Sequence, residues 1–140
     1  MPTWIFYALL SAMAAAAVAI FGKIGVAGID STLATAVRSI IMAAFLTVVI
    51  FATDKVKLLS TINSRAFMAI VAAGIAGALS WLFYFYALQN GPASGVAALD
   101  RLSVVFVLVF AVLLLGEKLT WQSALGAIMI TIGAILMSRK

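Results

Sequence analysis

Long apolar runs alternate with short polar stretches along the whole chain. A helix needs about 20 residues to cross the hydrocarbon core of a bilayer, with a tolerance of roughly 17–25. Five runs reach that length, namely Trp4–Phe21, Leu33–Thr53, Ala66–Leu88, Val96–Leu115 and Trp121–Met137. The runs lack the alternation of barrel strands, so helices are the spanning structure that fits. The sequence predicts an all-α integral membrane protein, one domain over residues 1–140 with five transmembrane helices.

Polar residues ahead of these runs predict where helices begin. Their side-chain oxygens accept hydrogen bonds from first-turn amides that lack a partner inside the helix. The expected caps are Asp30 or Ser31 for the second helix, Asn63 or Ser64 for the third, and Thr120 for the fifth. The second helix is expected to end at Asp54, and Asp54–Arg65 is then the most polar loop of the chain.

The fourth run combines a strong start signal with unusual contents. Pro92 suits a helix start because its fixed φ matches the helix and its missing N–H needs no partner there. No breaker follows, so we expect an uninterrupted helix to Leu115. Asp100 and Arg101 then lie inside a membrane-length segment, where a charge costs roughly 3 kcal/mol on insertion scales. These side chains are expected to face protein or water.

Composition narrows the possible chemistry. The chain is 66% hydrophobic and 9% charged, which points to the bilayer as its solvent. The absence of cysteine excludes disulfides and thiolate metal sites, and the absence of histidine removes the commonest general base and metal ligand. We therefore expect no enzyme, no metal and no cofactor, with proton coupling left open. The net charge of +5 indicates loop anchoring and lipid contact rather than nucleic-acid binding.

Arg38 and Asp100 are expected at matching depths. Each lies about seven residues inside its helix from the same side of the membrane, or roughly 10 Å at 1.5 Å per residue. The sequence predicts that Asp100 pairs with Arg38, either for function or only to fix helix register. Arg101 points about 100° away from Asp100, which leaves it for a ligand or for snorkelling to the interface.

Further polar and aromatic side chains gather in the same half of the bundle. Trp81 and Tyr84 share one face of the third helix, where ligand stacking competes with plain packing or an interfacial aromatic belt. The predicted substrate site comprises Arg38, Asp100, Arg101, Trp81, Tyr84, Asn90 and Ser94. Its net positive charge favours an anionic or zwitterionic substrate, because arginine binds carboxylates well.

Several short motifs then resemble one known family. They are Tyr84-Phe85-Tyr86-Ala87-Leu88, Gly91-Pro92-Ala93-Ser94, Leu102-Ser103-Val104-Val105, Leu115-Gly116-Glu117-Lys118-Leu119-Thr120, and the glycines Gly126 and Gly133. Their order and spacing resemble the EamA domain of the drug/metabolite transporter superfamily over essentially the whole chain. Most members are similar in having ten helices as two inverted copies of a five-helix unit, and many export small metabolites. This chain holds one copy, so the resemblance implies a dimer.

Three functions follow as alternatives. The leading expectation is a secondary transporter subunit that exports a small, amino-acid-like anionic or zwitterionic metabolite. The second is a cationic drug or quaternary-amine exporter that uses Asp100. The third is a non-transporting accessory or scaffold subunit of a larger membrane partner. The resemblance implies a multi-pass protein of a bacterial inner membrane.

The expected partner is a second copy of the chain. Gly126 and Gly133 lie seven residues apart on one helix face, where small residues let helices approach closely, so we expect them at the dimer interface. Basic residues outside the spans divide almost evenly between the two sides, as Lys55, Lys57, Arg65 and Lys118 against Lys23, Arg139 and Lys140. Orientation follows the excess of such charges. The near balance predicts an antiparallel, dual-topology homodimer, with a parallel dimer or a heterodimer with a second five-helix subunit as alternatives.

Overall fold

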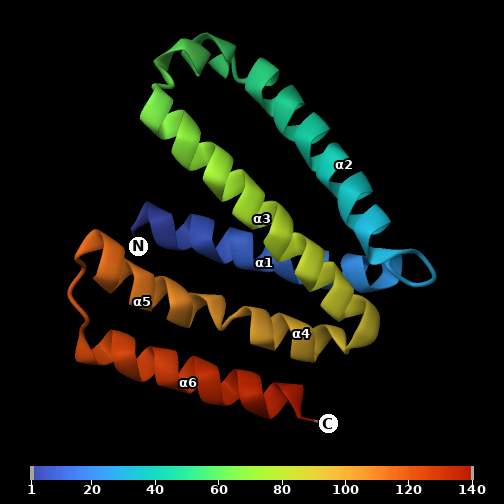
Figure 1. Ribbon diagram of the computed structural model, residues 1–140, viewed down its shortest axis with the longest axis vertical. Coiled ribbons are helices and arrows are strands. Elements are labelled where there is room, and N and C mark those ends of the chain that lie inside the picture. The colour runs from blue at the N-terminus through green and yellow to red at the C-terminus, as the bar shows by residue number, and fades with distance from the viewer. Residues whose placement is uncertain (1, 140) are drawn as a thin grey trace. The chain divides into compact units, whose positions relative to one another are not determined.

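The computed structural model describes residues 2–139, which are helical over most of their length (Figure 1). In chain order the elements are α1 Thr3–Gly25, α2 Ser31–Ala52, the 3₁₀ helix η1 Lys55–Thr61, α3 Ser64–Asn90, α4 Ala93–Asp100, α5 Ser103–Leu115 and α6 Trp121–Ser138. Within the described residues, α1, α2, α3, α6 and the combined segment Ala93–Leu115 are five helices long and apolar enough to cross a membrane. The predicted all-α membrane fold is confirmed. Lys140, which entered the charge count above, lies outside the described residues.

Most large apolar side chains are exposed on the outer faces of the helices, and few are buried in a core. Leu114 is 78% exposed and Trp121 is 76% exposed, whereas Leu88 is fully buried. Exposed apolar surface of this extent is unfavourable in water but favourable against lipid tails, because the chain then exchanges one apolar contact for another. The bilayer is therefore the solvent of this fold.

The predicted helix starts are correct where capping residues could be recognised. The Asp30 carboxylate accepts hydrogen bonds from two first-turn amides of α2, at 2.9 and 3.0 Å. Asn63 caps α3 through a bond of 2.8 Å from the Ala66 amide. Thr120 caps α6 through a bond of 3.2 Å from the Ser123 amide. Local side-chain chemistry thus determines these three boundaries.

The segment after α2 differs from its prediction. The helix ends at Ala52 rather than at Asp54, because Asp54 has the left-handed φ of 54° and leaves the helical path. The stretch expected to be a loop forms η1, and the Lys57 ammonium pairs with the Asp54 carboxylate at its start. Short 3₁₀ turns are common connectors between helices, and η1, with seven residues, is longer than most of them.

The fourth helix is not continuous, so that prediction is wrong. α4 ends at Asp100 and α5 begins at Ser103. Across the break the amides bond three residues back: Arg101 to the Ala98 carbonyl at 3.2 Å, and Leu102 to the Leu99 carbonyl at 3.0 Å. The ψ angles of Arg101 and Leu102 are −12° and −19°, close to 3₁₀ geometry. The break needs neither proline nor glycine, which are the signals that sequence analysis relies on.

The described chain divides into two compact units. The first contains residues 2–24 and 90–139, with α1, α4, α5 and α6. In it α4 packs on α6 at buried Gly95, where a Cβ would make ordinary van der Waals contacts, at 3.5 Å from the Met137 carbonyl oxygen and 3.6 Å from the Ser138 Cα. The Lys23 ammonium donates a hydrogen bond of 2.8 Å to the Gly91 carbonyl, which joins the end of α1 to the turn before α4.

The second unit, residues 25–89, consists of α2, η1 and most of α3. At one end the Gln89 side chain donates a hydrogen bond of 3.0 Å to the Ile29 carbonyl and joins α3 to the turn before α2. From that end α2 and α3 diverge toward η1, which bridges their far ends (Figure 1). The unit is therefore narrow near the Gln89 end and open near η1.

Candidate functional site

Arg38 is the charged centre of the second unit. It lies seven residues after Ser31, the first residue of α2, and so roughly 10 Å into the span at 1.5 Å per residue. Its guanidinium carbon lies 3.6 Å above the centroid of the Trp81 ring on α3 and 5.7 Å from that of Phe85. A cation within about 6 Å of an aromatic face is attracted by the ring quadrupole. The contact joins α2 to α3 where the two helices converge.

The aromatic side chains around Arg38 form one cluster on α3. Trp81, Tyr84 and Phe85 lie at i, i+3 and i+4, so one helix face presents all three. Trp81 meets Tyr84 edge to face at 5.3 Å between centroids and meets Phe85 at 6.1 Å, while Tyr84 and Phe85 are 6.4 Å apart. These spacings suit mutually supporting ring pairs. The cluster holds the Trp81 ring in place beneath the guanidinium.

Phe85 is a member of this cluster that the sequence analysis did not select. The available signal was its spacing, since it follows Trp81 by four residues and lies next to Tyr84. It was overlooked because an apolar ring in an apolar span looks like ordinary packing. The structure buries it to 4% exposure.

The electrostatics of Arg38 leave one donor unsatisfied. A charge inside a span costs roughly 3 kcal/mol on insertion scales, and a cation–aromatic contact returns roughly 0.5–2 kcal/mol. Among residues 2–139, the buried Arg38 Nη1 has no hydrogen-bond partner. A buried unpaired donor costs roughly 1–3 kcal/mol more. A carboxylate would remove that cost, since guanidinium and carboxylate form short, charge-assisted pairs.

The remaining predicted polar residues belong to the first unit. Asn90 ends α3, and exposed Ser94 is the second residue of α4. Half-buried Asp100 is the last residue of α4, and exposed Arg101 lies in the break that follows it. The break thus coincides with the charged pair that was singled out from the sequence. Asp100 and Arg38 belong to different units, and their pairing stays a prediction.

The glycines of α6 have free space beside them. A Cβ added at Gly126 or Gly133 would meet no atom within 4 Å among the described residues. Both positions are partly exposed on α6. The face that they form therefore leaves room for another helix, and its use as a dimer interface stays a prediction.

Acidic groups do not gather anywhere along the part of the chain that the structure describes. Residues 2–139 hold no cluster of three or more histidine, cysteine, aspartate or glutamate side chains that could hold a metal ion. The side chains at Arg38 offer a ligand positive charge, hydrogen-bond donors and aromatic faces.

Comparisons with known proteins agree with this picture. The model of the EamA-like transporter family matches residues 2–139. A protein from Sinorhizobium sp., named "Uncharacterized transporter in cobO 3'region", is 43% identical over 136 residues, which cover 97% of this chain and 96% of that protein. No solved structure matches the chain.

Proposed function

Since the chain belongs to the EamA-like transporter family and has five membrane-spanning helices, we propose that it is a subunit of a secondary transporter that exports a small anionic or zwitterionic metabolite. The observation that carries the substrate class is the state of Arg38. Its cation is stacked on Trp81 inside a span, and its buried Nη1 lacks a partner among the described residues. An amino-acid-like carboxylate supplies the missing acceptor.

The aromatic cluster favours the same class of ligand. In this proposal the contact with Trp81 restrains the Arg38 guanidinium, so that its N–H groups are held in place before the ligand arrives. Preorganised donors of this kind gain affinity because less conformational entropy is lost on binding. In this proposal Tyr84, Asn90, Ser94 and Arg101 line the translocation path.

The break between α4 and α5 supports a role for Asp100 in the same path. Transporters often bind substrates or coupling ions at interrupted helices, where backbone groups are released from the helix ladder. Asp100 ends α4, directly before the 3₁₀ turn. This placement favours a second candidate, export of a cationic drug or quaternary amine with Asp100 as the counter-charge, and it fits proton coupling in either case.

A dimer completes the proposal. Substrate sites of repeat-built transporters lie between two repeats, and this chain supplies one five-helix unit. The open glycine face of α6 gives a second copy a smooth surface to approach. We propose an antiparallel homodimer because basic residues divide almost evenly between the sides.

A cysteine in the turn 25–30 and one in η1, each in an otherwise cysteine-free chain, should both label partially from outside intact cells. Full labelling of one and none of the other would rule out dual topology.

A thermal-shift screen tests the substrate class. The purified chain is heated with amino acids, organic anions and quaternary amines in turn, because a ligand stabilises the state that it binds. We expect carboxylate ligands to raise the melting temperature of the wild type and of Arg139→Gln, but not of Arg38→Gln. A response confined to quaternary amines would favour the Asp100 candidate. Stabilisation of Arg38→Gln by the same carboxylates would refute the assignment of Arg38.

A further inference from the structure

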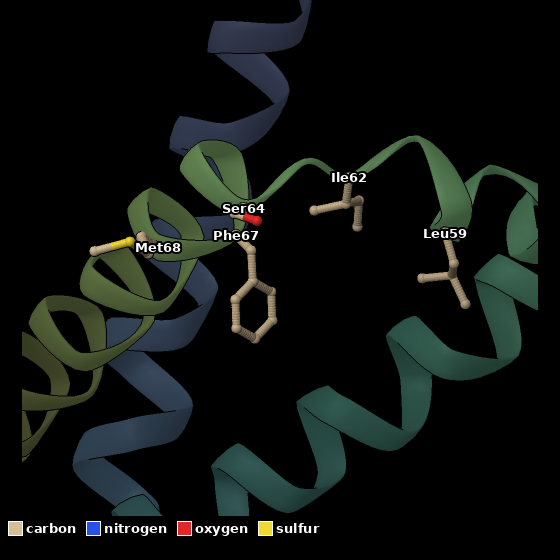
Figure 2. A pocket seen from close by; sticks show the side chains of 5 residues that line it. All are labelled: Leu59, Ile62, Ser64, Phe67 and Met68. Carbon is tan, nitrogen blue, oxygen red and sulfur yellow. The ribbon is translucent and has the colours of Figure 1, made fainter.

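The corner between η1 and α3 contains a hollow that the transport proposal does not use. Its volume is about 430 Å³, and four of its five lining side chains are apolar: Leu59, Ile62, Ser64, Phe67 and Met68. Figure 2 shows the side chains of Leu59, Ile62 and Phe67 pointing to the same side of the chain. The hollow lies where α2 and α3 are farthest from their point of convergence.

The sequence of η1 brings apolar and basic side chains together at this corner. With three residues per turn, positions i and i+3 of a 3₁₀ helix are aligned. Val56 and Leu59 therefore share one edge of η1, and Leu59 lines the hollow together with Ile62, the residue that follows η1 in an extended conformation. Lys55 and Lys57 fall on the other two edges, and Leu58 shares the edge of Lys55. Amphipathic helices lie in the membrane interface with their apolar face toward the hydrocarbon.

Basic residues lie close in sequence to the lining residues and outnumber the acidic ones. Residues 53–65 hold Lys55, Lys57 and Arg65 against the single acid Asp54. Lys57 pairs with that acid, whereas among residues 2–139 neither Lys55 nor Arg65 has an ion-pair partner. Arg65 follows the lining residue Ser64 in the first turn of α3, where the helix dipole adds positive potential. The connection between α2 and α3 thus carries uncompensated positive charge within a few residues of the apolar lining.

We propose that this corner is a binding site for an anionic phospholipid. Lys55 and Arg65 hold the headgroup phosphate, and one acyl chain covers the apolar hollow. The depth fits this arrangement, because Phe67 lies three residues after the start of α3, or roughly 5 Å toward the hydrocarbon at 1.5 Å per residue. Basic residues at the membrane surface attract anionic lipids, and the apolar edge contributes contact area that a free phosphate ion would not use. The site requires only that the chain spans a membrane, so it does not depend on the proposed substrate.

Native mass spectrometry of the purified full chain tests the proposal. The protein is released from nanodiscs that contain equal amounts of phosphatidylglycerol and phosphatidylcholine with identical acyl chains, and the ratio of the two bound lipids is measured. We expect the wild type to retain phosphatidylglycerol preferentially. Arg65→Gln and Lys55→Gln should each lower that preference about fivefold, as expected for loss of one interfacial basic residue. The matched control is Lys118→Gln, an exposed lysine outside the corner.

The apolar half of the site needs its own variant. Phe67→Ser keeps every charge but removes a large part of the lining, so it should lower retention of both lipids while leaving their ratio unchanged. Helical content by circular dichroism confirms that each variant is folded. An unchanged lipid ratio in Arg65→Gln, or an equal loss in Lys118→Gln, would contradict the headgroup site. Efficient disulfide crosslinking of Phe67→Cys between copies would show that a second chain, not a lipid, covers the hollow.

Discussion

Replacing Arg38 and Trp81, singly and together, tests the stacked cation that defines the site. The guanidinium carbon lies 3.6 Å from the ring centroid, well inside the effective range of about 6 Å. Because the contact is half-buried and inside a span, we expect a coupling free energy near the upper part of the usual range, about 1–2 kcal/mol. Phe85, at 5.7 Å, contributes less.

The cycle uses Arg38→Gln, Trp81→Leu and the double variant. Unfolding free energies come from titration with sodium dodecyl sulfate in mixed micelles, followed by circular dichroism at 222 nm. The Trp81→Leu change also removes two ring pairs, each worth roughly 0.5–1.5 kcal/mol. On its own it should therefore lower the free energy of unfolding by more than Arg38→Gln does. The double variant should be less destabilised than the sum of the singles by the coupling energy.

A matched cycle on the same helix provides the control. Phe83 lies two residues from Trp81, is 67% exposed and points away from that face. Arg38→Gln combined with Phe83→Leu should therefore be additive. The losses of unfolding free energy in Arg38→Gln and Trp81→Leu could also prove additive within the usual error of about 0.5 kcal/mol. The contact between the two side chains would then contribute nothing to stability, which would refute the reasoning about the site.

Three further predictions concern the other unit and the dimer. Asp100→Asn and Arg38→Gln should each lower stability or transport, and their double variant should be less than additive in a double-mutant cycle if the two charges are paired. Arg101→Gln should leave helical content and melting temperature unchanged, since Arg101 is exposed, but should weaken substrate binding measured by thermal shift; unaltered binding would remove it from the site. Gly133→Leu should shift native mass spectra toward monomer, because the side chain would fill the open face at Gly133. Persistence of the dimer would place the interface elsewhere.

The sequence was sufficient for the fold because its signals are local and strong. Apolar length gives the five spans, and caps such as Asp30 and Thr120 give helix starts through bonds to neighbouring amides. The break at Arg101 and Leu102 was missed because it follows from a small change in ψ at two ordinary residues. Helix propensity is an average over each residue type and does not report such a change.

For the candidate site, the sequence indicated the charged residue but not the side chains that it contacts. Intramembrane charge singles out Arg38 from the sequence, since such residues are kept for function or pairing. Its aromatic neighbours come from another helix, and spacing along α3 places Trp81 and Tyr84 on one face without identifying what that face meets. The stacking contact is tertiary, so only the structure reveals that Trp81 lies against Arg38. Phe85 enters the site by the same contact.

Solute exchange in proteoliposomes tests the central claim most directly. The purified chain alone is reconstituted into liposomes loaded with the carboxylate that gives the largest thermal shift, and exchange with radiolabelled external solute is measured. The account predicts saturable exchange by the wild type and by Arg139→Gln, and its loss in Arg38→Gln and in Arg38→Lys, which keeps the charge but loses the planar, stacked guanidinium. Undiminished exchange in Arg38→Gln, or no exchange of any carboxylate by the wild type, would contradict it.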